Sequence, residues 1–155
     1  MNRKFAFIGA GELAGAITEC LTTFYYGGGG GEPFVLYDVN KAQYEKYAGK
    51  NFLAAESIKD AVTCCDIIVL SVKPQHISSV LAEIKEGCPD LSGKTFVLPA
   101  AGVYMSRVTD VLGDVPVIRI MPNMPLKIGY GVTALCANSF VVPEVYKFIK
   151  DVFST

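Results

Sequence analysis

Short apolar segments alternate with segments of helical periodicity along the chain. The apolar segments are hydrophobic on both faces and rich in β-branched or aromatic residues, which is typical of parallel strands covered on both sides. The predicted strands are Phe5–Ile8, Phe34–Tyr37, Ile67–Ser71, Thr95–Leu98 and Val117–Ile120.

The segments between and after these strands predict amphipathic helices. Strands that alternate with helices predict βαβ units, so the fold class is α/β: a Rossmann-type, doubly wound, mostly parallel sheet with helices on both faces. Ser57 with Asp60 forms a weak capping box for one of the helices. The helical segments are Leu13 to Phe24, Ser57–Cys64, a segment that begins at Pro74 and includes Ile77, Val80, Leu81 and Ile84, and Pro143–Phe153.

Length and composition limit the classes of protein. The 155 residues fit one domain, 1–155, with a flexible loop of consecutive glycines at 27–31. Apolar residues make up 51% and charged residues 19%, which argues against disorder. The net charge of −1 argues against a nucleic-acid surface, and the apolar runs are too short to cross a membrane. The five cysteines fit neither a disulfide framework nor a zinc site, so we expect buried, reduced thiols in a cytoplasmic protein without a metal.

The clearest chemical signal is a glycine-rich turn directly after the first strand, with the pattern G-x-G-x-x-A. Gly9 lets the chain turn sharply, Gly11 lets a pyrophosphate approach the backbone, and Ala14 keeps the next helix close to the sheet. The unpaired N–H groups at that helix start favour phosphate. The pattern predicts a dinucleotide site, while a tight turn without a ligand is the alternative. The predicted contact residues are Gly9, Ala10, Gly11, Glu12, Leu13 and Ala14.

Two acidic residues bear on nucleotide binding. Glu12 places a carboxylate beside the expected pyrophosphate, where it either points outward or complements the helix N-terminus, and it can weaken nucleotide affinity. Asp38 ends the second strand, where a carboxylate usually binds the adenosine ribose and repels a 2′-phosphate. We therefore expect NADP or NAD as cofactor, with a slight preference for NAD. The neighbouring Asn40-Lys41 can instead hold a phosphate, and Asp38 is also compatible with an ordinary turn.

Three further loops follow strands and therefore face the ligand crevice of such a sheet. Lys73-Pro74 belongs to the first of them, and His76, the single histidine, is interpreted as a surface residue rather than a proton donor. Pro99–Val103 has small residues that let a flat ring approach the backbone. Asn123 carries an amide between two prolines that can orient a nicotinamide or substrate. Plain turn chemistry explains the last two loops equally well.

Five blocks along the chain together resemble the pyrroline-5-carboxylate reductase family. The resemblance implies an oxidoreductase of proline biosynthesis, in which a nicotinamide hydride reduces the cyclic imine 1-pyrroline-5-carboxylate to L-proline. In that family a helical domain for dimerisation and substrate binding follows, so we expect this chain to be the cofactor-binding part, with its activity alone left open. The blocks are Phe7-Ile8-Gly9-Ala10-Gly11, Val72-Lys73-Pro74, Ala100-Ala101-Gly102-Val103, Arg119-Ile120-Met121-Pro122-Asn123 and Gly131-Val132-Thr133-Ala134-Leu135.

The resemblance also implies roles for individual residues. Gly9 to Leu13 would hold the pyrophosphate, Asp38 the adenosine ribose, and Ser57 would lie near the adenine. Asn123 would face the reaction centre as the candidate catalytic residue. The nicotinamide half would be lined by Val72, Lys73, Pro74, Ala100 and Ala101.

Two other functions remain open at this point. The chain is alternatively a non-enzymatic NAD(P)-binding module, or the cofactor domain of a β-hydroxyacid-type dehydrogenase. A part of a longer enzyme would expose the apolar stripe of its last helix, whereas a self-sufficient module would cover it. Large exposed apolar areas promote association, so we expect self-association through this helix. The stripe contains Phe148, Ile149, Val152 and Phe153.

Overall fold

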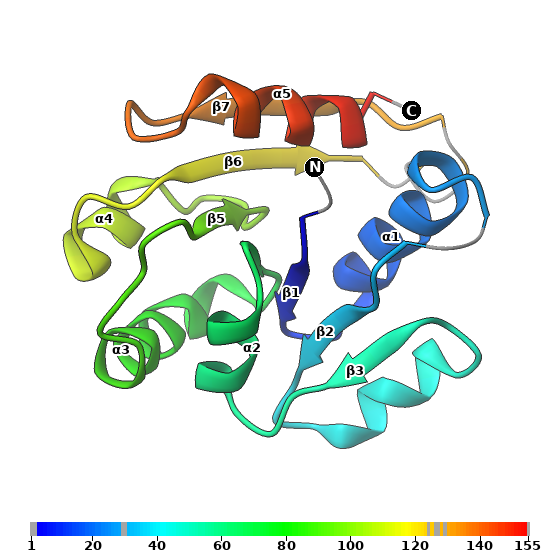
Figure 1. The fold of residues 1–155 in the computed structure, drawn as a ribbon, viewed down its shortest axis with the longest axis horizontal. Coiled ribbons are helices and arrows are strands. Elements are labelled where there is room, and N and C mark those ends of the chain that lie inside the picture. The colour runs from blue at the N-terminus through cyan, green and yellow to red at the C-terminus, as the bar shows by residue number, and fades with distance from the viewer. Residues whose placement is uncertain (1–2, 29–30, 124, 126–127, 129, 155) are drawn as a thin grey trace.

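The centre of the molecule is a seven-stranded sheet in the order β3-β2-β1-β4-β5-β6-β7 (Figure 1). A computed structural model describes residues 3–28, 31–123, 125, 128 and 130–154. All neighbouring strands run parallel except β6 and β7, which pair antiparallel. The predicted α/β class with a mostly parallel, doubly wound sheet is therefore confirmed. Two glycines of the predicted 27–31 loop, Gly29 and Gly30, lie outside the described residues.

The five predicted strands are all present. β3 and β7 are edge strands that the sequence analysis missed, because they are exposed on one side and small residues interrupt their apolar pattern. The predicted strands are β1 (Phe5–Ile8), β2 (Phe34–Tyr37), β4 (Ile67–Leu70), β5 (Thr95–Leu98) and β6 (Val117–Pro122), and the missed strands are β3 (Phe52–Ala54) and β7 (Thr133–Ala137).

The helices include two that were not predicted, α4 and a 3-10 helix after β2. Both are short and mostly exposed, so neither shows a long apolar stripe. The α-helices are α1 (Glu12–Cys20), α2 (Ile58–Cys64), α3 (Ile77–Gly87), α4 (Ser106–Leu112) and α5 (Pro143–Val152). A π-helical turn, Leu21–Tyr25, extends α1, and the 3-10 helices are Lys41–Tyr47 and Pro74–His76.

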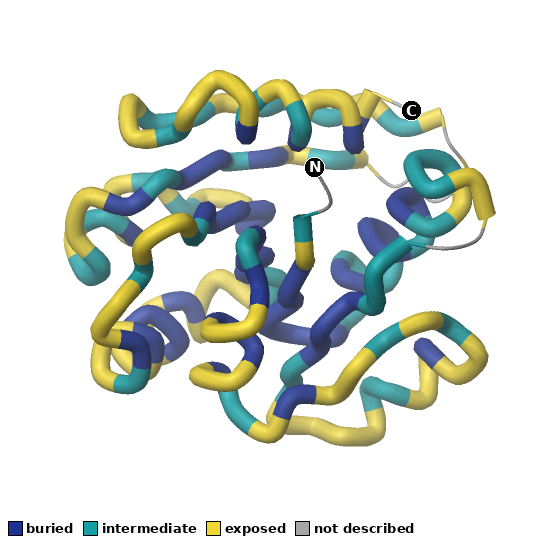
Figure 2. The backbone as a smooth tube through the Cα atoms, in the orientation of Figure 1, coloured by how far each residue is buried: buried dark blue, intermediate teal, exposed yellow. Residues whose placement is uncertain are grey.

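Two apolar cores cover the two faces of the sheet. Phe5 and Phe7 of β1 point to the core formed with α1 and α5, while Ala6 and Ile8 point to the core formed with α2, α3 and α4. This alternation follows from the period of two in a strand. Figure 2 shows the buried strands at the centre, with exposed residues on the outer helix faces and loops.

The apolar stripe of α5 is covered by the chain itself, so the exposure that was expected of a part of a longer enzyme is not present. Ile149 and Val152 are fully buried, and Phe153 is nearly so. Phe148 is half-buried and packs against Phe5, with ring centroids 5.9 Å apart. The stripe therefore closes the core on the α1 face, which removes the physical reason for expecting self-association through this helix.

All five cysteines are free thiols, as predicted. Cys20, Cys65 and Cys88 are buried. Cys64 and Cys136 are exposed, which corrects the expectation of five buried thiols, because one lies at the end of α2 and the other on the open face of an edge strand. Among the described residues, no helix combines the length and the apolar character that a membrane span requires.

Candidate functional site

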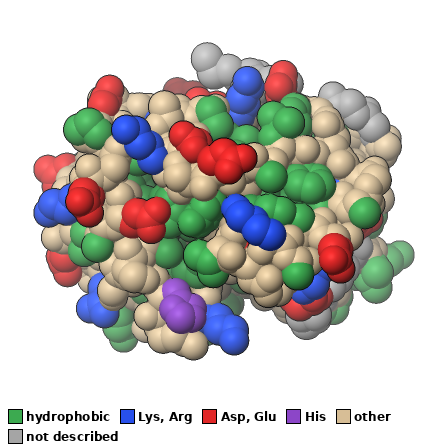
Figure 3. Space-filling view, turned by 90° about the horizontal axis from the view of Figure 1, so that it is seen from below, with side chains coloured by type: hydrophobic (Ala, Val, Ile, Leu, Met, Phe, Trp, Pro, Cys, Tyr) green, Lys and Arg blue, Asp and Glu red, His purple; other side chains and the backbone are tan. Residues whose placement is uncertain are grey.

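A cleft lies where the carboxyl ends of β1, β2 and β4 meet. In the strand order of this sheet, the connections from β1 and β4 leave in opposite directions, and such a switch point is where open α/β sheets bind ligands. The cleft has a volume of about 480 Å³. Figure 3 views the molecule from this side, where hydrophobic side chains form a recessed area with charged side chains around it. The lining residues are Ile8, Gly9, Gly11, Tyr37, Asp38, Val39, Asn40, Gln43, Ile58, Ser71, Val72, Lys73, His76, Ser79, Val80 and Glu83.

The two glycines of the turn have different surroundings. Gly9 has a φ of +98°, and a Cβ there would lie 2.8 Å from the Ser71 carbonyl oxygen, so only glycine fits. Gly11 has an ordinary φ of −78°, and a Cβ there would meet nothing within 4 Å. Gly9 is therefore required by the fold, whereas Gly11 keeps open the space in front of the helix that begins at Glu12.

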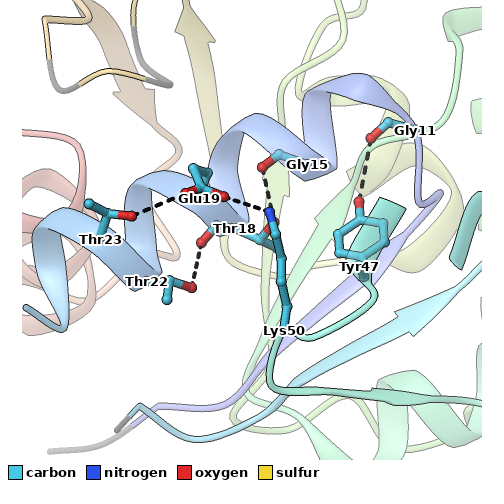
Figure 4. Close-up of polar contacts among 8 residues, drawn as sticks. All are labelled: Gly11, Gly15, Thr18, Glu19, Thr22, Thr23, Tyr47 and Lys50. Carbon is cyan, nitrogen blue, oxygen red and sulfur yellow. Dashed lines mark hydrogen bonds and ion pairs between the residues drawn. The ribbon is translucent and has the colours of Figure 1, made fainter. Parts of the chain in front are cut away.

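Three side chains from separate elements hold the turn in place. The Ser71 hydroxyl lies 2.7 Å from the Gly9 carbonyl oxygen, to which it donates. The Asp38 carboxylate accepts a hydrogen bond from the Ala10 N–H at 2.8 Å. The Tyr47 hydroxyl donates to the Gly11 carbonyl oxygen at 3.4 Å (Figure 4).

Sequence analysis missed two of these three residues, Ser71 and Tyr47. Ser71 could have been found, because it directly follows the strand beside β1. Tyr47 could not, because only the tertiary fold brings its 3-10 helix against α1. Its side chain is 1% exposed. This burial, followed by the negative charges of Glu12 and Asp38, raises the pKa of the Tyr47 hydroxyl, which therefore stays a protonated donor.

Asp38 is fixed at the end of β2 by backbone donors. Its second oxygen accepts from the Asn40 N–H at 2.8 Å, while the Asn40 side chain caps the Lys41–Tyr47 helix by accepting from the Ala42 N–H. The Lys41 amine lies 5.2 Å from the centroid of the Tyr37 ring and 5.4 Å from that of Tyr44. Asn40 thus acts as a helix cap, and Lys41 is held over two aromatic rings beside the cleft.

Glu12 points toward the Lys41–Tyr47 helix. One of its carboxylate oxygens lies 2.6 Å from the Lys46 amine, and the Glu12 side chain is 71% exposed. A second ion pair connects the same two segments, with the Lys50 amine 2.5 Å from a Glu19 carboxylate oxygen (Figure 4). Of the two possibilities left open by the sequence, Glu12 therefore has the outward orientation.

One face of α3 and the turn before it brings further residues to the cleft. His76, Ser79, Val80 and Glu83 recur at helical spacing, and the structure places all four in its lining. His76 is exposed, as predicted, and it also lines the cleft. Opposite them Val39 is 85% exposed, so its apolar surface is available to a flat ligand.

Nine predicted site residues lie outside this cleft lining. Four of them belong to the glycine turn and the start of α1, namely Ala10, Glu12, Leu13 and Ala14, and the other five lie later in the chain. The Ser57 hydroxyl accepts from the Asp60 N–H at 3.1 Å and so caps α2, as the capping box predicted. Pro74 lines a second cavity of about 350 Å³ together with Gly102 and Arg107. Ala100 is buried and Ala101 exposed at the end of β5, while Asn123 is exposed after β6.

The side chain of Asn123 is engaged within its own loop. Its Oδ1 accepts from the Val132 N–H at 2.9 Å, and its backbone N–H donates to the Val132 carbonyl oxygen at 3.2 Å. These two bonds join the end of β6 to the residue before β7. The roles that the resemblance gave to Asn123, Ser57, Pro74, Ala100 and Ala101 stay predictions.

The cleft suits a dinucleotide in its chemistry. The start of α1 presents the backbone N–H groups of its first turn and a positive dipole end, and Gly11 leaves that start uncovered. Leu13 and Ala14 lie within the same helix, with Ala14 fully buried against the sheet. Within the described part of the chain, no group of three or more His, Cys, Asp or Glu residues could hold a metal ion.

A family model described as NADP oxidoreductase coenzyme F420-dependent matches residues 4–102, which is more than half of the chain. The chain belongs to this family. The matched region contains the glycine turn, Asp38, Ser71 and the residues of α3, so nearly the whole cleft lies within it.

Curated relatives of the chain confirm the resemblance to pyrroline-5-carboxylate reductases. The chain is 29% identical to the pyrroline-5-carboxylate reductase of Pasteurella multocida over 98% of the chain and 55% of the relative. It is 32% identical to that of Escherichia coli K12 over 99% of the chain and 56% of the relative. The chain thus spans about half the length of the curated relatives it matches.

A solved structure extends this similarity to three dimensions. The pyrroline carboxylate reductase of Plasmodium falciparum, with NADP bound, has a TM-score of 0.83 and 26% identity, covering 99% of this chain and 55% of that one. The chain therefore corresponds in fold to about half of an oxidoreductase that binds a nicotinamide dinucleotide.

Proposed function

We propose that this chain binds a nicotinamide adenine dinucleotide and forms the cofactor-binding part of an enzyme that reduces 1-pyrroline-5-carboxylate to L-proline. The observation that carries the proposal is the open Gly11 position at the start of α1, with Asp38 fixed beside it in the same cleft. The relatives named pyrroline-5-carboxylate reductase support the choice of substrate, a small cyclic imine.

Each part of the cleft has a role in this proposal. The backbone N–H groups at the start of α1 bind the pyrophosphate, and Asp38 accepts hydrogen bonds from the adenosine ribose. Val39 and Val80 contact the adenine and exclude water from its faces, while Val72 lies toward the nicotinamide half. When bound, the nicotinamide supplies the hydride that reduces the C=N bond of the imine. The nicotinamide half then lies toward Lys73 and the loops after β5 and β6, which include Ala100, Ala101 and Asn123.

We further propose that NAD is preferred over NADP. The Asp38 carboxylate is held in position by the Ala10 and Asn40 N–H groups, so it cannot easily turn away from a 2′-phosphate. A carboxylate held in this position repels the negatively charged 2′-phosphate of NADP. The Lys41 amine is the opposing influence, but it lies over the Tyr37 and Tyr44 rings.

The first experiment is a titration of the 155-residue chain with NADH and with NADPH, followed by nicotinamide fluorescence. We expect saturable binding, tighter for NADH, and binding of NADH that is about 100-fold weaker in a Gly11→Val variant. Addition of 1-pyrroline-5-carboxylate, with absorbance at the reduced-nicotinamide band monitored, then tests turnover. Binding without oxidation supports a cofactor-binding part, whereas the absence of binding by either nucleotide would overturn the proposal.

The nucleotide preference has its own test. In an Asp38→Ser variant the charge is removed, so the ratio of the NADPH and NADH dissociation constants should fall by about tenfold. A Lys41→Ala variant serves as the counterpart, because it should move this ratio the other way or leave it unchanged. An unchanged ratio in Asp38→Ser would remove Asp38 from nucleotide discrimination.

Two further proposals concern the whole protein. The five free thiols fit a reducing compartment, and we propose the cytoplasm. Self-association stays a prediction, and sedimentation of the chain at several concentrations tests it. Because the α5 stripe is buried, an associated form would have to use another surface.

A further inference from the structure

Glu12 is an acidic residue at a position where the proposed function needs positive potential. It occupies the first position of α1, directly after Gly11, where the helix dipole attracts anions. A free carboxylate there would compete with a pyrophosphate for the same partial charge and would repel it. A dinucleotide site of this sequence therefore requires that the charge of Glu12 be compensated.

Lys46 is placed to provide this compensation. Its amine lies 2.6 Å from a Glu12 carboxylate oxygen, which is within hydrogen-bond distance. The contact directs the Glu12 side chain toward the 3-10 helix Lys41–Tyr47, and Glu12 is not among the residues that line the cleft.

The helix that carries Lys46 is itself fixed to the glycine turn. Tyr47, the next residue, is buried and donates to the Gly11 carbonyl oxygen, while Asn40 caps the helix at its other end. The backbone of Lys46 is therefore already fixed relative to α1, whether or not the ion pair with Glu12 forms. Less backbone freedom is lost when the ion pair forms than in a pair between two mobile segments.

We propose that Lys46 is a positioning residue for dinucleotide binding: it neutralises Glu12 and keeps its carboxylate away from the pyrophosphate. This inference rests on the proposed function, because it concerns the same cleft. It assigns to an exposed ion pair an effect on ligand affinity rather than on the stability of the fold. Exposed ion pairs contribute little to stability, so the two effects can be separated.

The chain contains a matched control for this ion pair. Lys50, three residues after this 3-10 helix, pairs with Glu19 of α1 at 2.5 Å, and both side chains are partly exposed. Its amine also lies 5.9 Å from the centroid of the Tyr47 ring. Glu19 lies two helical turns beyond Glu12, about 10 Å further along α1. Loss of the Lys50 pair should loosen the segment as much as loss of the Lys46 pair, but it leaves the charge at the glycine turn unchanged.

The test compares two ligands at two salt concentrations. ADP-ribose carries the pyrophosphate and adenosine does not, and their dissociation constants are measured by calorimetry on wild type, Lys46→Ala, Lys50→Ala and the double variant Glu12→Gln with Lys46→Ala. We expect Lys46→Ala to weaken ADP-ribose binding by about three- to tenfold at low salt and to leave adenosine binding unchanged. The effect should shrink at 0.5 M salt, where the Debye length is about 4 Å.

The remaining variants decide between a charge effect and a structural one. We expect Lys50→Ala to match wild type and the double variant to recover wild-type affinity for ADP-ribose. Equal losses in Lys46→Ala and Lys50→Ala, or no recovery in the double variant, would overturn the inference while leaving the proposed function intact. If wild type binds neither ADP-ribose nor NADH, the proposed function fails, and the inference fails with it.

Discussion

The two halves of the sheet's carboxyl edge differ in how their loops are held. At the ends of β1, β2 and β4, side chains from one loop bond to the backbone of another, as Asp38 and Ser71 do with the glycine turn. At the ends of β5 and β6, Ala101 and Asn123 are exposed, and the described bonds of Asn123 stay within the β6–β7 connection. The difference indicates that the half proposed to bind adenosine and pyrophosphate is held by bonds between its loops. In the half proposed for the nicotinamide, the described bonds of Asn123 do not reach another loop of the cleft.

Among the variants that test this difference, Gly9→Ala should have the largest effect on the free energy of unfolding. The new Cβ would lie 2.8 Å from the Ser71 carbonyl oxygen at a φ of +98°, so we expect a loss of about 3 kcal/mol in the free energy of unfolding. Gly93→Ala is the control, because Gly93 has a φ of +73° with open space around it. When both variants are unfolded with urea, Gly93→Ala should lose only about 1 kcal/mol of unfolding free energy relative to wild type. Equal losses would show that the packing against Ser71 is unimportant.

Gly11→Val should affect binding instead of folding. A Cβ at Gly11 meets no protein atom within 4 Å, so we expect the unfolding midpoint to stay near that of wild type. The same side chain fills the space in front of α1, and we expect affinity for NADH to fall about 100-fold, or about 2.7 kcal/mol. Gly11→Ala should give an intermediate loss. Unchanged affinity in both variants would contradict the assignment of the turn to a dinucleotide.

Ser71→Ala tests the bonds between the loops. The variant loses the hydroxyl that donates to the Gly9 carbonyl oxygen, so we expect a loss of about 1 kcal/mol in unfolding free energy. Ser154→Ala removes a hydroxyl bonded to the exposed Lys150 carbonyl oxygen and should cost less than about 0.5 kcal/mol. If the two variants are equally stable, Ser71 does not hold the turn.

The smallest effect on ligand affinity is expected from Asn123→Ala, in the half of the sheet's carboxyl edge formed by the ends of β5 and β6. If its amide faces the nicotinamide, affinity for NADH should fall by about two- to threefold while affinity for ADP-ribose, which lacks the nicotinamide, stays the same. Both constants are measured by the same calorimetric titration. Equal changes in affinity for the two ligands would place Asn123 outside the nicotinamide site. Its role would then be limited to the hydrogen bonds that join the end of β6 to the residue before β7.

The sequence predicted the parts of the molecule that depend on local pattern. Strands buried on both faces, the helix stripes and the Ser57 cap all follow from neighbouring residues. The Gly9 and Gly11 positions were also predictable, because a sharp turn between a strand and a helix restricts residue choice. Edge strands were missed because one of their faces is exposed. Lys46 and Tyr47 were missed because their contacts join residues far apart in sequence, and the Glu12 orientation depends on those contacts.

The burial of α5 has a consequence for synthesis of the chain. The core that contains α2, α3 and α4 includes no buried residue beyond Val117, so it can close before the last strand has left the ribosome. The opposite core also needs Val145, Ile149, Val152 and Phe153. Until these residues emerge, the aromatic face of β1 has no cover from α5. Until α5 emerges, we therefore expect this face of the sheet to be covered by α1 alone and to be more open to aggregation or to a chaperone.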